Sequence, residues 1–302
     1  MGPWKRGALR RGNDVGGHGV RRAAPYDSGM STTAPRTPPP SPSAEVGAVL
    51  RAWRSARRFS QLDLSLEANV SPRHLSYVET GKSQPSREMV ARLADALGMP
   101  LRERNALMIA AGYAPEYRET SLATPEMAPV RRALEFMLAQ QEPYPALVMT
   151  RHWDVVLVND ALTRVFGMLA GRPPKHANIL RQIFDPDDMR PFVDNWEEVA
   201  GDVVRHLHEQ IAAAPSDGKS RALLDEALAW PGVPERWRMR EAGSTPLPLL
   251  TTNFRARDTV LRFFSTFATF GTSRDVTVDE LRIECMFPAD DATAALCRSL
   301  RA

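Results

Sequence analysis

The stretch SQLDLSLEANVSPRHLSYVETGKSQPS, residues 60–86, says more about the fold than any other part of the chain. Ser60 caps a short helix, and Ser71 followed by Pro72 begins another, because serine favours the N-cap and proline the first helical turn. Gly81 ends that second helix. We expect three residues of the first helix to point inward: Leu62, Leu66 and Ala68. Two short helices joined by a tight connection are therefore predicted.

Apolar residues recur at helical spacing on both sides of this stretch. Before it, a helix from Glu45 places four apolar side chains on one face: Val46, Val49, Leu50 and Trp53. After it, one helix runs from Ser86 to Gly98 and another covers residues 100–111. The pattern predicts a compact all-α five-helix domain over residues 45–111.

Residues 1–44 are rich in glycine, proline, arginine and serine and end in TAPRTPPPSPS. Such a tract buries too little apolar surface to fold alone, so we expect a disordered basic tail. Met30 offers an alternative start to Met1, and the intact mass of the native protein distinguishes the two.

A polar connector, residues 112–124, separates the helical pattern from a different one. Further helices are expected at 125–141, 160–170, 190–213, 217–229 and from Asp290. Strands are expected at 146–150, 154–158, 247–256, 259–270 and 281–287, the first two joined by a turn at 151–153. This order predicts an α+β domain over residues 125–302, with a mostly antiparallel sheet that has one face covered.

Charge is distributed unevenly along the 302 residues, whose formal net charge is +3. Residues 1–44 carry seven Lys/Arg against two Asp, residues 45–111 ten against seven acidic, and the remainder twenty-two against twenty-seven. A basic N-terminal half followed by an acidic C-terminal half is typical of a nucleic-acid-binding domain joined to a domain with another role. Two cysteines without a CxxC support neither a disulfide scaffold nor a zinc site. No signal peptide or membrane span is indicated, so we expect a cytoplasmic protein without membrane contact.

Residues 60–86 closely resemble the phage-repressor (Xre-type) helix-turn-helix family. The matching features are Gln61, Ala68, Val70, Ser71, Leu75-Ser76, Glu79-x-Gly81 and Pro85-Ser86. In that family the helix that begins here at Ser71 lies in the DNA major groove. The resemblance therefore implies a DNA-binding domain whose partner is double-stranded DNA.

The resemblance also implies which residues contact DNA: Gln61, Ser71, Pro72, Arg73, His74, Ser76, Tyr77 and Lys82. Arg73 can reach O6 and N7 of guanine in a bidentate pair, and His74 offers a weaker donor. Gln61 and Lys82 are placed to hold phosphates. A solvated surface remains the alternative for Arg73 and His74. Because such domains commonly pair across half-sites about 34 Å apart, we expect a homodimer.

The second part of the chain resembles the ligand-binding domain of MmyB-type regulators, which is similar to a PAS fold. The matching segments are EPYPALV (142–148), RHWDVVLVN (151–159), NIL (178–180), FVDNWEEVA (192–200), FFSTFATFGTSRDVT (263–277) and ELRIECMFPAD (280–290). The resemblance implies a small-molecule effector, and a fatty acid or another hydrophobic metabolite is the class we expect.

The strand at 259–270 carries aromatic residues on both faces, so one face can pack on helices while the other lines an apolar cavity. Candidate ligand-binding residues are Asn159, Phe192, Asn195, Trp196, Arg255, Phe263, Thr266 and Phe267. A sheet filled by its own side chains remains the alternative.

Catalytic motifs are not evident. His206 and His208 lie two apart on an expected helix, where they do not face one another, and there is no nucleophile elbow, phosphate loop or GxGxxG. We expect no enzymatic activity, cofactor or metal. The sequence predicts a transcription regulator that joins an Xre-type helix-turn-helix domain to an MmyB-type ligand-binding domain. A protein-interaction adaptor, whose second domain only dimerises, is the alternative.

Overall fold

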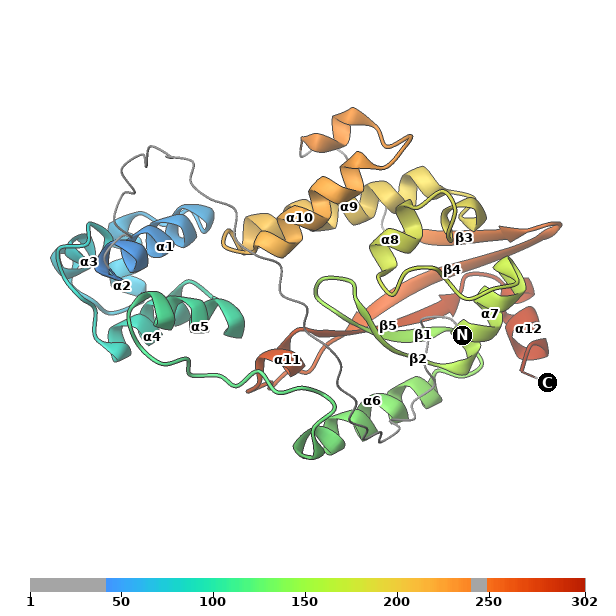
Figure 1. Cartoon of the computed structure of the whole chain (residues 1–302), viewed down its shortest axis with the longest axis horizontal. Coiled ribbons are helices and arrows are strands. Elements are labelled where there is room, and N and C mark those ends of the chain that lie inside the picture. The colour runs from blue at the N-terminus through green and yellow to red at the C-terminus, as the bar shows by residue number, and fades with distance from the viewer. Residues whose placement is uncertain (1–41, 240–248, 302) are drawn as a thin grey trace, which may run out of the picture.

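The computed structural model describes residues 42–239 and 249–301. Figure 1 shows a group of helices on one side of the molecule and a sheet flanked by helices on the other. The expected disordered tail lies outside the described residues up to Ser41. The first helix begins at Pro42 rather than at Glu45.

Five helices build the first part of the chain, as predicted. They are α1 (Pro42–Ala56), α2 (Gln61–Glu67), α3 (Pro72–Glu79), α4 (Arg87–Ala96) and α5 (Leu101–Ala110). The predicted serine caps are confirmed, since Ser60, Ser71 and Ser86 each accept a hydrogen bond from a backbone N–H three residues further on. Trp53 of α1 belongs to the domain core, with 1% of its surface exposed.

The prediction that Leu62 and Leu66 point inward is wrong. These side chains are 56% and 70% exposed, whereas Leu64, Ser65 and Ala68 are buried. Leucines alternate with polar residues along this seven-residue helix, so its apolar residues mark no single helical face. Packing of α2 on α3 and α4 selects the buried face.

A close helix contact fixes how α1 sits on α3. A Cβ at Gly47 would lie 2.6 Å from the carbonyl oxygen of Glu79 and 2.7 Å from that of Val78. Backbone atoms cannot move aside as a flexible side chain can, so only glycine fits at this position.

We therefore expect Gly47→Ala to destabilise the helical domain by about 1 to 3 kcal/mol, the usual cost of overpacking. Hydrogen exchange of residues 45–111 in the full chain measures the loss. Gly167→Ala is the matched control, because a Cβ at that helical glycine meets nothing within 4 Å. Equal exchange rates in the two variants would show that α1 and α3 can separate without cost.

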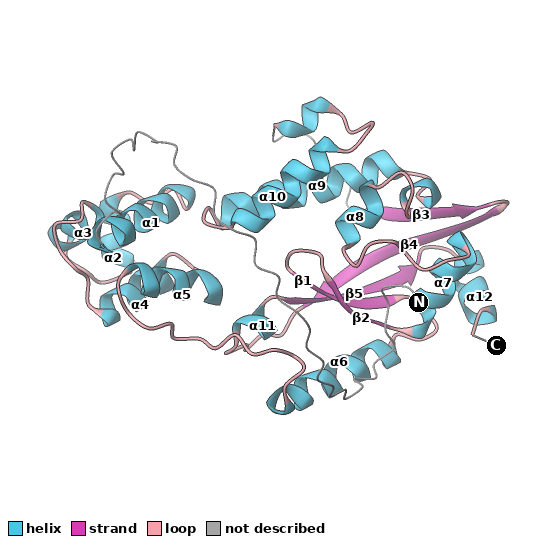
Figure 2. Ribbon diagram, in the orientation of Figure 1, coloured by secondary structure: helices cyan, strands magenta, loops and turns pink. Residues whose placement is uncertain are grey.

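The second part of the chain is built on one antiparallel sheet. Its strands are β1 (Ala146–Thr150), β2 (Val155–Val158), β3 (Thr251–Ala256), β4 (Thr259–Ala268) and β5 (Leu281–Pro288). Their spatial order is β2-β1-β5-β4-β3, and every neighbouring pair is antiparallel. The predicted α+β class is confirmed (Figure 2). Residues 247–248 of the expected third strand lie outside the described residues.

Helices cover both faces of this sheet, which corrects the expectation that one face is covered. The helical elements are η1 (Pro125–Met127), α6 (Ala128–Gln140), α7 (Asp160–Ala170), α8 (Ile179–Phe184), η2 (Arg190–Phe192), α9 (Trp196–Ala213), α10 (Gly218–Ala229), η3 (Glu235–Arg238), α11 (Val276–Asp279) and α12 (Asp291–Ser299). On one face, α6 packs on apolar residues of β1 and β5. On the other, α7 and α12 pack on one part of the strands, α8 and α9 lie over another part, and α10 packs against α8 and α9.

One predicted helix is shorter than expected. The helix predicted over 190–213 begins at Trp196, and the chain before it forms η2 and then a bridge from Val193 to Phe254 of β3. Asp194 also donates its backbone N–H to the carbonyl of Asn253 at 2.7 Å. Pairing with the edge strand therefore replaces the first turns of that helix.

Candidate functional site

Side-chain caps fix the starts of α2 and α3. Ser60 Oγ accepts from the Asp63 backbone N–H at 3.1 Å, and the Asp63 carboxylate accepts from the Ser60 backbone N–H at 2.9 Å. Asn69, between the helices, has φ of 50°, the left-handed region that asparagine tolerates. Ser71 Oγ accepts from the His74 backbone N–H at 3.4 Å. The contacts at Asn69 and Ser71 fix the turn that leads from α2 into α3.

The two faces of α3 differ sharply. Leu75 and Val78 are fully buried in the core. The outer face exposes Ser71, Pro72, Arg73, His74 and Tyr77. Ser76 is half-buried beside them. The structure thus brings the expected base-reading residues of this helix together on one surface.

Arg73 is held in place without losing its charge. Its Nε donates to the Tyr77 hydroxyl at 3.2 Å, and its guanidinium lies 5.5 Å from the centre of the Tyr77 ring. His74 Nε2 lies 3.3 Å from Ser83 Oγ. Neither Arg73 nor the exposed Lys82 forms an ion pair within the described part of the chain. Their positive charge is available to an anionic partner.

Gln61 lies at the start of α2 but turns its side chain toward the domain. Its Nε2 donates to the buried Glu79 carboxylate at 2.7 Å, and Arg54 donates to the same carboxylate at 2.7 and 3.0 Å. These hydrogen bonds raise the pKa of Arg54 above its ordinary value. Arg57 donates to the carbonyl of Leu97 at 3.0 Å. Arg54 and Arg57 therefore make contacts within the domain itself.

A cavity of about 430 Å³, which we call the sheet cavity, lies between the sheet and helices α8 and α9. Its size falls within the range of small-molecule sites. Its apolar lining is Met149, Trp153, Ile179, Ile183, Val203, Leu249, Leu250 and Phe267. Polar groups from β4, β5 and α9 complete the wall, so the cavity offers an apolar body with a few hydrogen-bonding groups.

Two charged side chains of β5 face the sheet cavity. Burial raises the pKa of Glu284, although Ser265 Oγ donates to its carboxyl at 2.6 Å. Desolvation lowers the pKa of Arg282, whose guanidinium donates to two backbone carbonyls. The carboxyl of Glu284 or the guanidinium of Arg282 can therefore contact the polar head group of a molecule in the cavity.

The expected ligand-binding residues are not gathered in one place. Phe267 lines the sheet cavity, and Phe263 lies in the core below it with no exposed surface. Phe192 packs against the same core. Asn159 caps α7, accepting from Leu162 and Ala146 backbone N–H groups at 3.0 Å.

The other four expected ligand-binding residues lie elsewhere. Thr266 is opposite Cys285, on the sheet face that α6 covers. Arg255, on the edge strand β3, pairs with Asp194 at 2.7 Å. Asn195 and Trp196 line a more polar surface groove of about 800 Å³ along α9.

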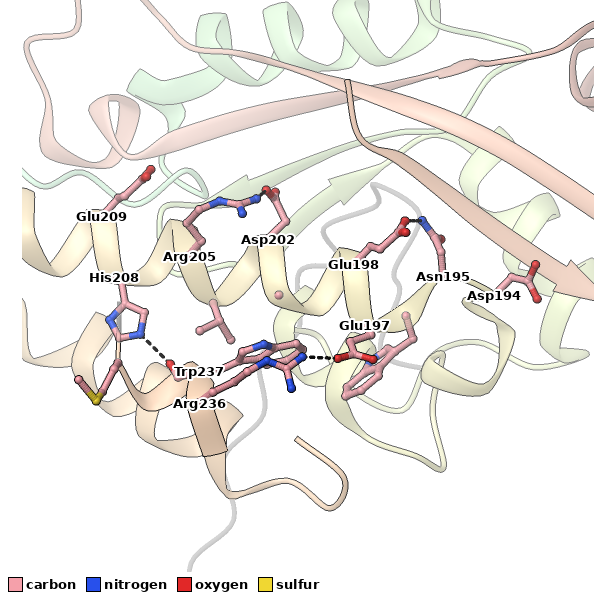
Figure 3. A pocket seen from close by; sticks show the side chains of 14 residues that line it. Asp194, Asn195, Glu197, Glu198, Asp202, Arg205, His208, Glu209, Arg236 and Trp237 are labelled. Atoms are coloured by element: carbon pink, nitrogen blue, oxygen red, sulfur yellow. Dashed lines mark hydrogen bonds and ion pairs between the residues drawn. The ribbon is translucent and has the colours of Figure 1, made fainter. Parts of the chain in front are cut away.

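Figure 3 shows this surface groove, with η3 on one side of α9. Its charges are largely paired, since Glu197 contacts Arg236 at 2.5 Å and Asp202 contacts Arg205. His208 Nε2 lies 2.9 Å from the carbonyl oxygen of Trp237. Most of its polar groups therefore already have partners.

Sequence reasoning missed the main polar groups of the sheet cavity. Arg282 and Glu284 occupy alternate positions in the apolar strand LRIECMF, so their side chains share a sheet face. Two charges on one face of an otherwise apolar strand were the available signal. Trp153 and Gln210 carried no comparable signal, because their place on the cavity depends on how α9 crosses the sheet.

Comparison with known proteins identifies both parts of the chain. Residues 45–107 match the helix-turn-helix domain model. Residues 130–300, more than half of the chain, match the model of the MmyB-like transcription regulator ligand binding domain. This chain belongs to the MmyB-like transcription regulators. It is a helix-turn-helix regulator with an MmyB-like ligand-binding domain.

Each of the similar proteins covers only part of this regulator. HTH-type transcriptional regulators of Mycobacterium bovis and Mycobacterium tuberculosis are 33% identical over 110 residues, which is 36% of this chain and 39% of theirs. The match thus spans about two fifths of those relatives. The controller protein C.AhdI from Aeromonas hydrophila is 29% identical over 20% of this chain and 94% of that one, with a TM-score of 0.20. The clp gene regulator ClgR from Corynebacterium glutamicum is 30% identical over 24% and 91%, with a TM-score of 0.22.

Two further observations concern the described residues only. None of the helices there is both long and apolar enough to cross a lipid bilayer. Within the same ranges, no three His, Cys, Asp or Glu side chains are grouped so that they could hold a metal ion.

Proposed function

We propose that this regulator reads operator DNA as a homodimer through the outer face of α3, and that its sheet cavity binds a small, mainly apolar effector. The observation that carries the DNA contacts is the exposed guanidinium of Arg73, which Tyr77 holds at the start of α3 and which has no ion-pair partner among the described residues. A guanidinium in that position can pair with O6 and N7 of guanine. The exposed His74 beside it supplies a second donor to base edges.

Phosphate contacts would position this helix. Lys82 is exposed just beyond α3, and the N-terminus of α3 presents backbone N–H groups. Gln61 can contact a phosphate only if its side-chain amide releases Glu79, or if a hydrogen bond involving its amide oxygen reaches the phosphate. Such contacts set the register of the protein on DNA and carry no sequence information.

The homodimer follows from the small area of one reading domain. A single module of this kind buries about 600 to 1,000 Å² on DNA, which is too little for tight and selective binding. Two copies on an inverted or direct repeat double the contact. Analytical ultracentrifugation with operator DNA tests this point, and one copy per operator would contradict it.

The effector is best matched by a fatty acid or a similar hydrophobic metabolite. The sheet cavity offers aliphatic and aromatic walls for a chain, and Arg282, Glu284 and Ser265 for a polar head. A ligand that binds only the folded protein raises its melting temperature. Dodecanoate should therefore stabilise the full chain, or a related molecule should co-purify with it. Val203→Phe, which occupies part of the cavity, should weaken either effect.

Electrophoretic mobility shift with genomic fragments tests the regulator against the adaptor. A regulator gives a salt-sensitive shifted band on particular fragments. An adaptor gives none. Because a regulator of this kind acts on chromosomal DNA, we place the protein in the cytoplasm of a bacterium.

A further inference from the structure

The two domains meet at a cluster of charged side chains. Glu103 on α5 is only 4% exposed. Within the described residues, its carboxylate meets partners from the second domain alone: it accepts from Arg151 Nη2 at 3.3 Å and from Ser216 Oγ. Arg151, in the turn between β1 and β2, also contacts Asp217 at 2.8 Å and Glu280 at 3.4 Å. One guanidinium thus joins carboxylates of both domains.

Contacts around this cluster place it at the centre of the domain junction. Ala214, in the turn between α9 and α10, packs into the core of the helical domain. Trp53 Nε1 donates to Ser216 Oγ at 3.4 Å, and Arg102 pairs with Glu280 at 2.6 Å. The junction therefore involves α1 and α5 but leaves α3 away from the second domain, as Figure 1 shows.

In the second domain, the charged groups of this cluster have several hydrogen-bond and ion-pair partners. Burial opposes ionisation of Asp217, but hydrogen bonds from His152 and Ser220 and the charge of Arg151 outweigh it and hold the pKa of this carboxyl well below its usual range. Asp217 also caps α10. Asp217 thereby holds Arg151 at the start of α10. The contact between Glu103 and Arg151 therefore depends on where Arg151 lies.

Arg151 also lines the sheet cavity. Gln210 on α9 donates to the carbonyl of Arg151 at 3.4 Å, and its own Oε1 is buried without a hydrogen-bond partner in the described structure. The same holds for Nε1 of Trp153, two residues after Arg151. Both side chains line the cavity. Unsatisfied polar groups therefore lie in the wall of the cavity, one on the turn that carries Arg151 and one on α9 beside it.

We propose that Arg151 is the positioning residue through which the sheet cavity sets the placement of the helix-turn-helix domain. This inference rests on the proposed sensing function and specifies how it is transmitted. An occupant that shifts the turn between β1 and β2 moves Arg151 away from Glu103, which loosens α5 from the second domain. The second domain does not cover α3 when the two domains are in contact. The effect therefore falls on the spacing of the two reading domains in a dimer, and not on whether DNA can reach α3.

Hydrogen exchange of the full chain tests this coupling without DNA or ligand. Val203→Phe places a ring in the cavity from α9 and stands in for part of an occupant. We expect it to speed exchange of residues 101–111, in the other domain, by at least about fivefold, the lower end of typical coupling between sites. In a Glu103→Gln background the same substitution should add nothing, because the ion pair between Arg151 and residue 103 is already lost.

Arg181→Gln is the matched background, since it breaks an ion pair with Glu226 inside the second domain at 2.7 Å and should leave the response intact. If Val203→Phe does not fold, Ile183→Phe fills the cavity from α8 instead. The proposal is overturned if Val203→Phe changes exchange only within the second domain. It is also overturned if Val203→Phe speeds exchange of α5 equally with Glu103 and with Glu103→Gln. Failure of the sensing function itself would appear separately, as absence of any ligand effect on melting.

Discussion

Raising the salt concentration from about 50 to about 200 mM is expected to weaken operator binding by about 10³- to 10⁵-fold, because a dimer that neutralises about six to ten phosphates releases counterions as it binds. The structure supports this expectation at each reading domain. Arg73 on α3 and Lys82 just beyond it are exposed, and neither pairs with a carboxylate among the described residues. Fluorescence anisotropy titrations of a labelled operator across this salt range measure the slope.

Lys82→Ala separates phosphate contacts from general charge. It should lower the salt slope by about one for each reading domain and weaken binding to all sequences alike. Lys175→Ala removes the same charge from the second domain, where Lys175 lies near Asp185 and Asp187, and should leave the slope unchanged. A nearly flat salt dependence for the unaltered protein would contradict DNA reading and favour the adaptor.

Glu79→Ala is expected to destabilise the helical domain by about 3 to 5 kcal/mol, the usual cost of removing one partner of a buried ion pair. Glu79 is 1% exposed and joins three helices. From α3 its carboxylate accepts two hydrogen bonds from Arg54 of α1 and one from Gln61 of α2. Since whole domains are stable by only about 5 to 15 kcal/mol, this loss should partly unfold the reading domain.

Hydrogen exchange of the full chain resolves where that loss occurs. Residues 45–111 should exchange much faster in the Glu79→Ala variant, while residues 125–239 should change little. Glu67→Ala removes an exposed carboxylate from the end of α2 and should alter stability by no more than about 0.5 kcal/mol. Similar effects of the two substitutions would show that the contacts of Glu79 do not hold the domain together.

Local signals in the sequence were enough to define the helical domain. Serines at positions 60, 71 and 86 begin helices because their hydroxyls satisfy backbone N–H groups, whatever the rest of the chain does. The strands of the second domain were found for a similar reason, since β-branched and aromatic runs such as 259–268 favour extended chain. Both features depend on neighbours within a few residues.

Features that depend on distant contacts could not be predicted in the same way. Leu62 and Leu66 lie outside because α3 and α4 occupy the other side of α2. The start of α9 shifted because residues 193–194 pair with β3. The contact of Arg151 with Glu103 joins residues 48 apart in sequence, and no local pattern at either position reports it. The polar wall of the sheet cavity belongs to this second group.

The most direct test of the account is the sequence preference of the outer face of α3. Selection from random duplex DNA with the unaltered protein should yield a defined half-site, and the folded double variant Arg73→Ala with His74→Ala should lose preference at one or more of its positions, at about 1 to 3 kcal/mol for each lost base contact. Lys82→Ala should weaken binding yet select the same half-site. If the double variant, shown to be folded, selects an unchanged half-site, α3 does not read base pairs through these residues.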